Sequence, residues 1–200
     1  MRLNVYYDNP NKASDMYLKY LKKDCEANNI EVVTFDNIDD WTTKNCGRAE
    51  LILEPTKAFF VPYYVRYNVD RPSATAQGIR DYIVENHPQR DKTILVIGRG
   101  LVGKALVDML MDYGYTVIET NSKTRLIDLS MFALYADIIV GVSSKDNIFD
   151  KEWSERLITL HKVLIDASNN FDTKDKLRCG KWTRKIIIDR IKELEEETNE

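Results

Sequence analysis

The chain has 200 residues, which is enough for one large domain or two small ones with a substantial core. Its 44% hydrophobic and 30% charged residues are typical of a globular protein, and a net charge of −3 gives no basic footprint for nucleic acid. No apolar run is long enough to cross a membrane. Three scattered cysteines and two histidines offer no disulfide framework, metal site or Ser-His-Asp triad, so we expect a cytoplasmic protein with reduced thiols.

The first 74 residues alternate between the periodicities of strands and helices. The chain starts with a strand pattern rather than a signal peptide. Strands are predicted near 3–7, 30–35 and 51–53, with a long helix at 14–28 and a shorter one within 36–47. This β-α-β-α-β order indicates a small α/β lobe. The aromatic-rich residues 56–74 are predicted to be an irregular connection that either lines a cleft or fills the space between lobes.

The rest of the chain is organised around residues 93–103. An unbroken apolar run at the start of this segment predicts a parallel strand buried on both faces. Gly98, Gly100 and Gly103 follow with the spacing G-x-G-x-x-G, and an amphipathic helical pattern comes directly after them. This is the context of a dinucleotide fingerprint, whose glycines permit a tight turn, the approach of a pyrophosphate and close packing of helix on strand. The alternative is a glycine turn that serves packing alone.

Helices and strands continue to alternate on both sides of this turn. We predict further strands at 115–119, 138–142 and 163–166, and helices at 75–86, 126–135, 153–160 and 183–197. Such alternation implies right-handed crossovers and a parallel sheet with helices on both faces. The predicted fold class is therefore α/β, with a small N-terminal lobe and a larger Rossmann-like lobe.

Six short segments carry a further signal. Residues 96–103 read Val-Ile-Gly-Arg-Gly-Leu-Val-Gly, and five shorter segments lie at 73–79, 121–124, 136–139, 164–166 and 180–183. Taken in chain order, the six segments resemble motifs of the methylenetetrahydrofolate dehydrogenase/cyclohydrolase family. Residues 96–103 are similar to the family's V-[IV]-G-R-S-x-x-V-G, with one residue fewer. The resemblance implies a catalytic lobe at 1–74, a Rossmann-like NAD(P)-binding lobe at 75–180, and a C-terminal helix at 181–200 that packs back on the first lobe.

The first lobe also carries parts of that family's pattern. Residues 14–17, Ser-Asp-Met-Tyr, look like the start of its S-x-x-Y-x-x-x-K helix motif, but Leu21 stands where the family has its catalytic lysine. Residues 68–71 are similar to its D-V-D-G. The resemblance therefore implies that Tyr17 orients a folate and that Asp70 hydrogen-bonds its pterin. The alternatives are a core tyrosine and a carboxylate that caps a loop.

The resemblance implies two reactions on a folate substrate. One is hydride transfer from 5,10-methylenetetrahydrofolate to a nicotinamide, which is chiefly a matter of positioning. The other is hydrolysis of the methenyl product, which needs a positioned acid or base. Because Leu21 cannot move a proton, we expect dehydrogenase activity with little or no cyclohydrolase activity.

The glycine turn and the resemblance together assign the cofactor site. The predicted cofactor-binding residues are Gly98, Arg99, Gly100, Leu101, Val102, Gly103, Glu119, Ser122 and Asn169. Glu119 lies about 20 residues beyond Gly98, and a carboxylate at this distance typically accepts the ribose 2′-hydroxyl and favours NAD. In contrast, Arg99 and Ser122 stand at positions that the family uses near the adenosine phosphate. Both NADP and NAD stay open, and the charge of Arg99 inclines the expectation toward NADP.

Two other classes of function stay open. The chain could be a catalytically inactive module that binds nucleotide or folate, which the loss of lysine at position 21 favours. It could also be a Rossmann reductase of another substrate. The resemblance implies a homodimer, whereas neither nucleic acid nor a membrane is an expected partner.

Overall fold

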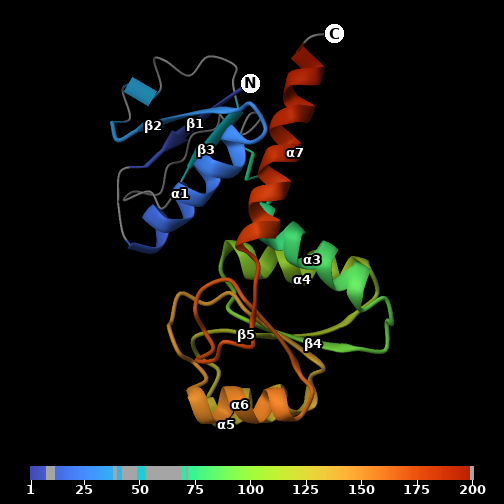
Figure 1. Cartoon of the computed structure of the whole chain (residues 1–200). Helices are drawn as coiled ribbons and strands as arrows, with labels where there is room; N and C mark the ends of the chain where they lie inside the picture. Colours follow the sequence, from blue (N-terminus) through green and yellow to red (C-terminus); the bar gives the residue numbers. More distant parts are fainter. Residues whose placement is uncertain (8–11, 38–39, 42–48, 53–68, 71, 199–200) are drawn as a thin grey trace. The chain divides into compact units, whose positions relative to one another are not determined.

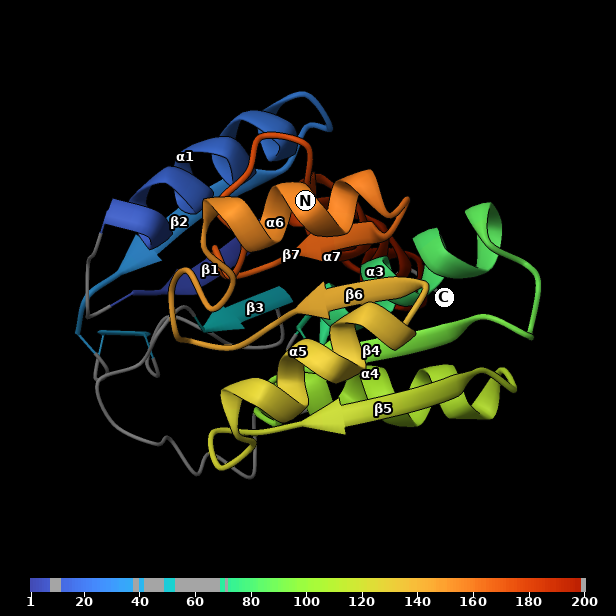
Figure 2. The same ribbon diagram turned by 90° about the horizontal axis from the view of Figure 1, so that it is seen from below.

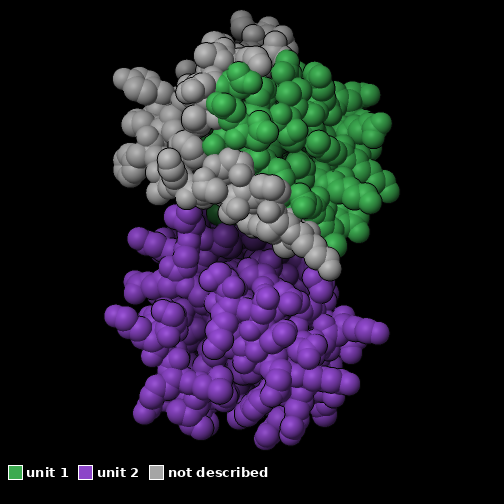
Figure 3. All heavy atoms as spheres, turned by 90° about the vertical axis from the view of Figure 1, so that its left-hand side faces the viewer, with its two compact units in different colours: residues 1–74, 184–200 green, residues 75–183 purple. Residues whose placement is uncertain are grey.

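The computed structural model describes residues 1–7, 12–37, 40–41, 49–52, 69–70 and 72–198 (Figure 1). The chain divides into two compact units, which are described separately (Figure 3). Unit 1 comprises Met1–Ala74 and Arg184–Glu200, and unit 2 comprises Thr75–Thr183. The last helix, α7 (Gly180–Thr198), begins in unit 2 and continues in unit 1. Within the described ranges, no helix is long and apolar enough to cross a membrane.

Unit 1 contains a three-stranded parallel sheet with the strand order β2-β1-β3. Its elements are β1 (Arg2–Tyr6), α1 (Lys12–Glu26), β2 (Glu31–Phe35) and β3 (Ala49–Ile52). One face of the sheet carries Leu3, Val5 and Leu51. These side chains are buried together with Leu21 of α1 and Ile187 of α7. The core of unit 1 thus lies between the sheet and the apolar stripes of two helices.

The opposite face of this sheet buries a carboxyl group. Side chains alternate along a strand, so Glu50 lies on the face opposite Leu51, beside its register partner Asn4. The side chain of Glu50 is only 1% exposed, and neither of its oxygens has a hydrogen-bond partner among the described residues. Burial raises the pKa of Glu50 to about 7, because the charged form loses its hydration.

Unit 2 contains a five-stranded parallel sheet with the strand order β5-β4-β6-β7-β8. Its elements are α3 (Ala74–Asn86), β4 (Thr93–Ile97), α4 (Leu101–Asp112), β5 (Thr116–Thr120), α5 (Leu126–Tyr135), β6 (Ile138–Gly141), α6 (Lys151–Thr159), β7 (Val163–Asp166) and β8 (Leu177–Arg178). From β4 the chain adds β5 on one side and then returns to add β6 on the other. The sheet therefore has a topological switch point between β4 and β6, where open α/β sheets bind ligands.

Both faces of this sheet are covered by helices (Figures 1 and 2). Ile94 and Val96 of β4 pack in one core cluster with Leu106 of α4 and with α3. Leu95 and Ile97 pack in a second cluster with α5 and α6. All five residues of β4 are buried, as expected for a central strand with a continuous apolar run.

The α/β class and the parallel sheet predicted from the sequence are confirmed. Strand β8 was not predicted, because two residues give no periodicity. Helices α6 and α7 begin two and three residues earlier than expected, within the usual uncertainty of helix ends. Residues 53–68, which include most of the predicted aromatic connection, lie outside the described residues, as does most of 36–47.

The buried carboxyl group predicts how stability depends on pH. The pKa of Glu50 is about 7 in the fold, whereas an exposed glutamate has a pKa of about 4.3. Between these values the folded chain holds a proton that the unfolded chain has lost. The free energy of unfolding should therefore fall as pH rises from about 4.5 to 7, by about 1.4 kcal/mol for each unit of pKa shift.

Urea unfolding followed by circular dichroism at pH 5 and pH 7.5 checks this expectation. Glu50→Gln should remove the decrease, because a neutral amide of the same shape does not titrate. Glu31→Gln, at an exposed position of β2, is the matched control and should retain it. An equal decrease in the Glu50→Gln variant would show that another group is responsible.

Candidate functional site

The glycine turn lies at the carboxyl end of β4, beside the switch point. Gly98 has a backbone φ angle of +117°, which residues other than glycine rarely adopt. Its N–H donates to the carbonyl of Thr120 at 3.1 Å, which ties the turn to the end of β5. A Cβ atom at Gly98 would lie 2.8 Å from the backbone nitrogen of Ser143. Conformation and space therefore both require glycine here.

The other two glycines differ in their surroundings. A Cβ atom at Gly103 would lie 1.8 Å from the carbonyl oxygen of Gly98, so the first turn of α4 packs directly on the strand end. In contrast, a Cβ atom at Gly100 would meet no atom of the described residues within 4 Å. Packing within the fold thus explains Gly98 and Gly103, but it does not explain Gly100. The open side of Gly100 is where a bound group can approach the backbone.

Helix α4 begins at this open position. Gly100 is its N-cap residue and, among the described residues, no side chain caps it. The first backbone N–H groups of a helix have no partner within the helix and lie at its positive end, an arrangement that suits a phosphate. Val102 packs against the core, whereas the side chain of Leu101 is 88% exposed. At these two positions the groups suited to a phosphate are therefore the peptide N–H groups and not the side chains.

Charged and hydroxyl side chains gather at the end of β5. Arg99 Nε lies 3.1 Å from Glu119 Oε1, and their side chains are 60% and 26% exposed. Ser122 is exposed in the turn that follows β5. That turn is held by the side chain of Asn121, which accepts from the N–H of Lys123 at 2.8 Å. The structure thus places Arg99 in contact with Glu119, and Ser122 three residues further along the same edge.

The loops after β6 and β7 are joined by the buried side chain of Asn170. Its Oδ1 accepts from the N–H of Ser143 at 3.1 Å, and its Nδ2 donates to the carbonyls of Ser143 and Lys145 at 2.9 and 2.6 Å. A Cβ atom at Gly141 would lie 2.5 Å from Asn170 Oδ1, so glycine is needed to admit the amide. The loop that touches the glycine turn through Ser143 is thereby fixed from β7.

Asn169, the last of the predicted cofactor residues, is exposed but contacts a buried network. It has a φ of +65°, and its Oδ1 accepts from Lys176 Nζ at 3.1 Å. The same ammonium lies 2.6 Å from Asp166 Oδ2 and also donates to the carbonyl of Phe171. Asp166 in turn accepts from the N–H of Asn170 at 3.0 Å. Both the side chain and the backbone carbonyl of Asn169 therefore have partners in the protein, since the carbonyl accepts from the N–H of Asn147 at 2.9 Å.

Sequence reasoning missed Ser143, Asn170 and Lys176. Asn170 follows the noted Leu-Ile-Asp segment by four residues, and this short spacing is the one available signal. Nothing in the sequence indicates that Lys176 is almost completely buried, because lysine is ordinarily a surface residue.

The residues predicted for the folate side all belong to unit 1. Leu21 is completely buried in the core, and Tyr17 packs at the edge of the same cluster. Asp70 Oδ1 accepts from the N–H of Ala74 at 2.9 Å and thereby caps the first turn of α3. Lys22, next to Leu21, is exposed. Asp70 therefore has the capping contact that the alternative interpretation predicted.

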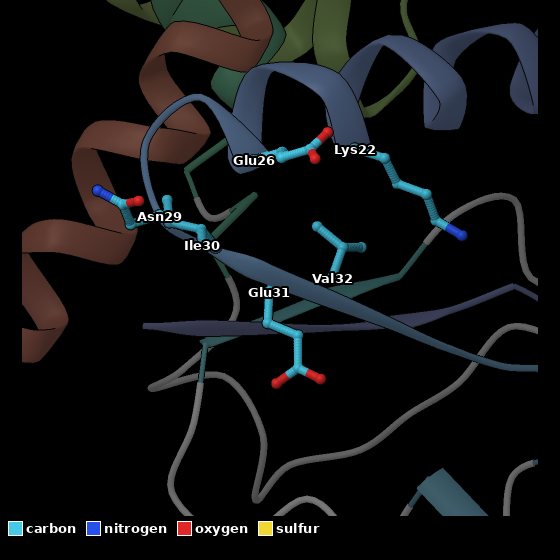
Figure 4. A pocket seen from close by; sticks show the side chains of 6 residues that line it. All are labelled: Lys22, Glu26, Asn29, Ile30, Glu31 and Val32. Carbon is cyan, nitrogen blue, oxygen red and sulfur yellow. The ribbon is translucent and has the colours of Figure 1, made fainter.

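Lys22 also lines a shallow hollow on unit 1 (Figure 4). The hollow has a volume of about 360 Å³ and is formed by α1, the turn at Asn29 and the start of β2. It contains none of the predicted site residues. Among the described residues, no group of three or more histidine, cysteine or acidic side chains is placed to hold a metal ion.

The fold and the glycine turn define unit 2 as a Rossmann-like unit with an open position at the start of a helix. The family model described as "Tetrahydrofolate dehydrogenase/cyclohydrolase, NAD(P)-binding domain" matches residues 73–193. The chain therefore belongs to the tetrahydrofolate dehydrogenase/cyclohydrolase family, as the sequence motifs predicted.

Curated relatives match about half of the chain. The bifunctional protein FolD of Burkholderia lata is 33% identical over 111 residues, which are 55% of this chain and 36% of that protein. FolD of Ralstonia pickettii is 35% identical over 96 residues, 48% of this chain and 31% of that protein. The matched segment thus spans about a third of the length of these relatives.

Solved structures resemble the chain along its whole length. A FolD of Trypanosoma brucei, complexed with NADP and an inhibitor, has a TM-score of 0.76 at 14% identity and covers 98% of this chain and 87% of its own. The NAD-dependent 5,10-methylenetetrahydrofolate dehydrogenase of Saccharomyces cerevisiae also has a TM-score of 0.76, at 13% identity, covering 99% and 88%. At such identities the likeness establishes the fold.

The buried ion pair predicts a large effect on stability. Lys176→Met should lower the free energy of unfolding by about 3–5 kcal/mol, because it leaves the carboxylate of Asp166 buried without a counter-charge. The double variant Lys176→Met/Asp166→Asn should recover part of this loss. Denaturant unfolding monitored by circular dichroism measures both. Lys174→Met, at an exposed position nearby, is the control and should change the free energy of unfolding little. If Lys176→Met also changes it little, the buried ion pair is contradicted.

Proposed function

We propose that unit 2 binds NAD or NADP with the pyrophosphate at residues 98–103. The observation that carries this proposal is the contrast among the three glycines. Gly98 and Gly103 are enclosed by the fold, whereas Gly100 is open on the side where a Cβ atom would stand. A turn that served packing alone would have no need of glycine at position 100. The uncapped start of α4 and the family's NAD(P)-binding domain support the same conclusion.

The surrounding residues fit the two ends of such a cofactor. The side chains of Arg99, Glu119 and Ser122 stand at the end of β5, where a Rossmann fold holds the adenosine ribose. The loops that carry Ser143 and Asn169 stand at the ends of β6 and β7, on the other side of the switch point. We expect these loops to line the nicotinamide half.

We further propose that the chain is a 5,10-methylenetetrahydrofolate dehydrogenase of one-carbon metabolism. The cofactor accepts the hydride from the folate methylene group, and the protein positions the two reactants. In this proposal residues 1–74 form the folate lobe, residues 75–180 the cofactor lobe, and residues 181–200 the returning helix. Tyr17 orients the folate, and Asp70 contacts the pterin in addition to capping α3. Membership of the family supports this reaction.

A cyclohydrolase reaction has less support. Hydrolysis of a methenyl folate requires a group that activates water and moves protons. Leu21 has no such group and is completely buried in the core, whereas the neighbouring Lys22 and Lys23 are exposed. A cytoplasmic homodimer, as the sequence analysis expected, stays part of the same proposal.

The second candidate is a catalytically inactive module that binds nucleotide. Two observations favour it: Leu21 is a core residue, and the carboxylate of Asp70 is already engaged by the start of α3. Turnover of methylenetetrahydrofolate separates this module from the dehydrogenase. Binding of the nucleotide without turnover would favour the module, and turnover of a different substrate would indicate another Rossmann reductase.

Gly100→Val should abolish cofactor binding and leave the fold intact. The valine side chain would occupy the space that a pyrophosphate needs, yet it meets no protein atom within 4 Å at its Cβ position. Titration with NADH and NADPH, followed by their fluorescence, measures binding, and circular dichroism verifies the fold. Met111→Val, at an exposed position near the other end of α4, is the control and should leave binding unchanged. Undiminished binding by Gly100→Val would place the site elsewhere.

Formation and decay of methenyltetrahydrofolate should separate the two reactions. We expect the parent chain to form the methenyl compound with NAD or NADP and to hydrolyse it little faster than buffer does. General acid–base catalysis is typically worth about 10²–10⁴-fold, so an active hydrolase would be obvious. Lys22→Ala and Lys23→Ala are the informative variants, since Leu21→Lys would bury a charge in the core. Rapid hydrolysis that disappears in either variant would contradict the assignment of position 21.

A further inference from the structure

The proposed nucleotide site contains an ion pair that bears on the choice between NAD and NADP. Arg99 belongs to the glycine turn and Glu119 to β5, and Arg99 Nε lies 3.1 Å from Glu119 Oε1. Neither residue is needed for the core, since Arg99 is largely exposed and Glu119 is partly so. Their function must therefore be sought in what the turn binds or in the pair itself.

The backbone fixes the position of the carboxylate. Strands β4 and β5 are parallel and in register, with Val96 beside Glu119 and Ile97 beside Thr120. The N–H of Gly98 continues this ladder by donating to the carbonyl of Thr120. Because side chains alternate, Glu119 shares a face with Val117, which packs in the cluster that includes α4. The carboxylate is thus held on the side of the sheet from which α4 starts.

The side chains of Arg99 and Glu119 differ in how freely they can move. Glu119 is 26% exposed and belongs to a strand that is hydrogen-bonded to β4, whereas Arg99 is 60% exposed on a longer side chain from a turn. Exposed ion pairs are individually weak, so a ligand can draw the guanidinium away at little cost. The carboxylate has no comparable freedom. The fixed charge of the site is therefore that of Glu119.

NAD and NADP present opposite chemistry to this carboxylate. The adenosine ribose of NAD carries a 2′-hydroxyl, which can donate a hydrogen bond to a carboxylate. NADP carries a phosphate at the same position, with close to two negative charges at pH 7. To reach Arg99, that phosphate must separate the ion pair and then lie beside an uncompensated carboxylate. Favourable contact with one ligand and repulsion of the other are the two elements of specificity.

We propose that Glu119 makes the site select NAD over NADP, and that its contact with Arg99 keeps the arginine charge compensated until a cofactor binds. This inference rests on the nucleotide binding proposed for unit 2. The sequence-based inclination toward NADP treated the charge of Arg99 as free. The carboxylate of Glu119, 3.1 Å from the guanidinium, gives the physical reason for reversing it, because a phosphate that binds Arg99 must also lie beside that negative charge.

Equilibrium titrations of the full chain with NADH and NADPH test the proposal. The parent should bind NADH more tightly. In Glu119→Gln the ratio of the NADPH and NADH dissociation constants should fall about tenfold or more, because one like charge beside the phosphate is removed while an amide oxygen still accepts from the hydroxyl. The preference of the parent should also weaken as salt is raised, since ions screen partly exposed charges.

Two further variants keep the result interpretable. Glu155→Gln removes one exposed negative charge on α6 and should leave the ratio unchanged. Arg99→Ala changes an exposed side chain without risk to the fold and should weaken NADPH binding more than NADH binding. A parent that prefers NADPH, or a ratio in Glu119→Gln within twofold of the parent's, would overturn the selection of NAD while leaving the nucleotide site intact. Binding of neither cofactor by the parent would overturn both.

Discussion

The close approach of Gly103 to the carbonyl of Gly98 is the constraint on which the rest of the site depends. A Cβ atom at Gly103 would lie 1.8 Å from that oxygen, so the helix can start only where the strand ends if this side chain is absent. That packing aims the first N–H groups of α4 across the carboxyl edge of the sheet. It also leaves the side of Gly100 open to a ligand. Strand, turn and helix thus form one unit that presents backbone donors at the start of α4.

The two sides of the switch point differ in how deeply their charged side chains are buried. On the β5 side the charges are near the surface, in the pair of Arg99 and Glu119, and can respond to a ligand. On the β7 side the charges of Lys176 and Asp166 are almost completely buried and compensate each other within the loop. Because leaving either buried charge alone is costly, that loop is held in one conformation. The site therefore combines a buried ion pair that fixes the loop after β7 with an exposed ion pair near the end of β5 that a ligand can rearrange.

Local patterns in the sequence predicted the features that local chemistry decides. The buried strand and the three glycines lie within eleven residues, with the helix directly after them, and their turn chemistry does not depend on distant partners. Features that distant residues decide could not be predicted. Asn170 joins loops 27 residues apart, and the burial of Lys176 depends on its pairing with Asp166. The burial of Leu21 likewise depends on α7, which is more than 160 residues further along the chain.

A crystal structure of the chain grown with saturating NADH tests the central claim most directly. The account predicts that the pyrophosphate accepts hydrogen bonds from the peptide N–H groups at the start of α4, with its closest approach at Gly100. The adenosine ribose should lie within hydrogen-bond distance of Glu119. A dinucleotide bound at another edge of the sheet, or a glycine turn that stays free of ligand at saturating NADH, would contradict it.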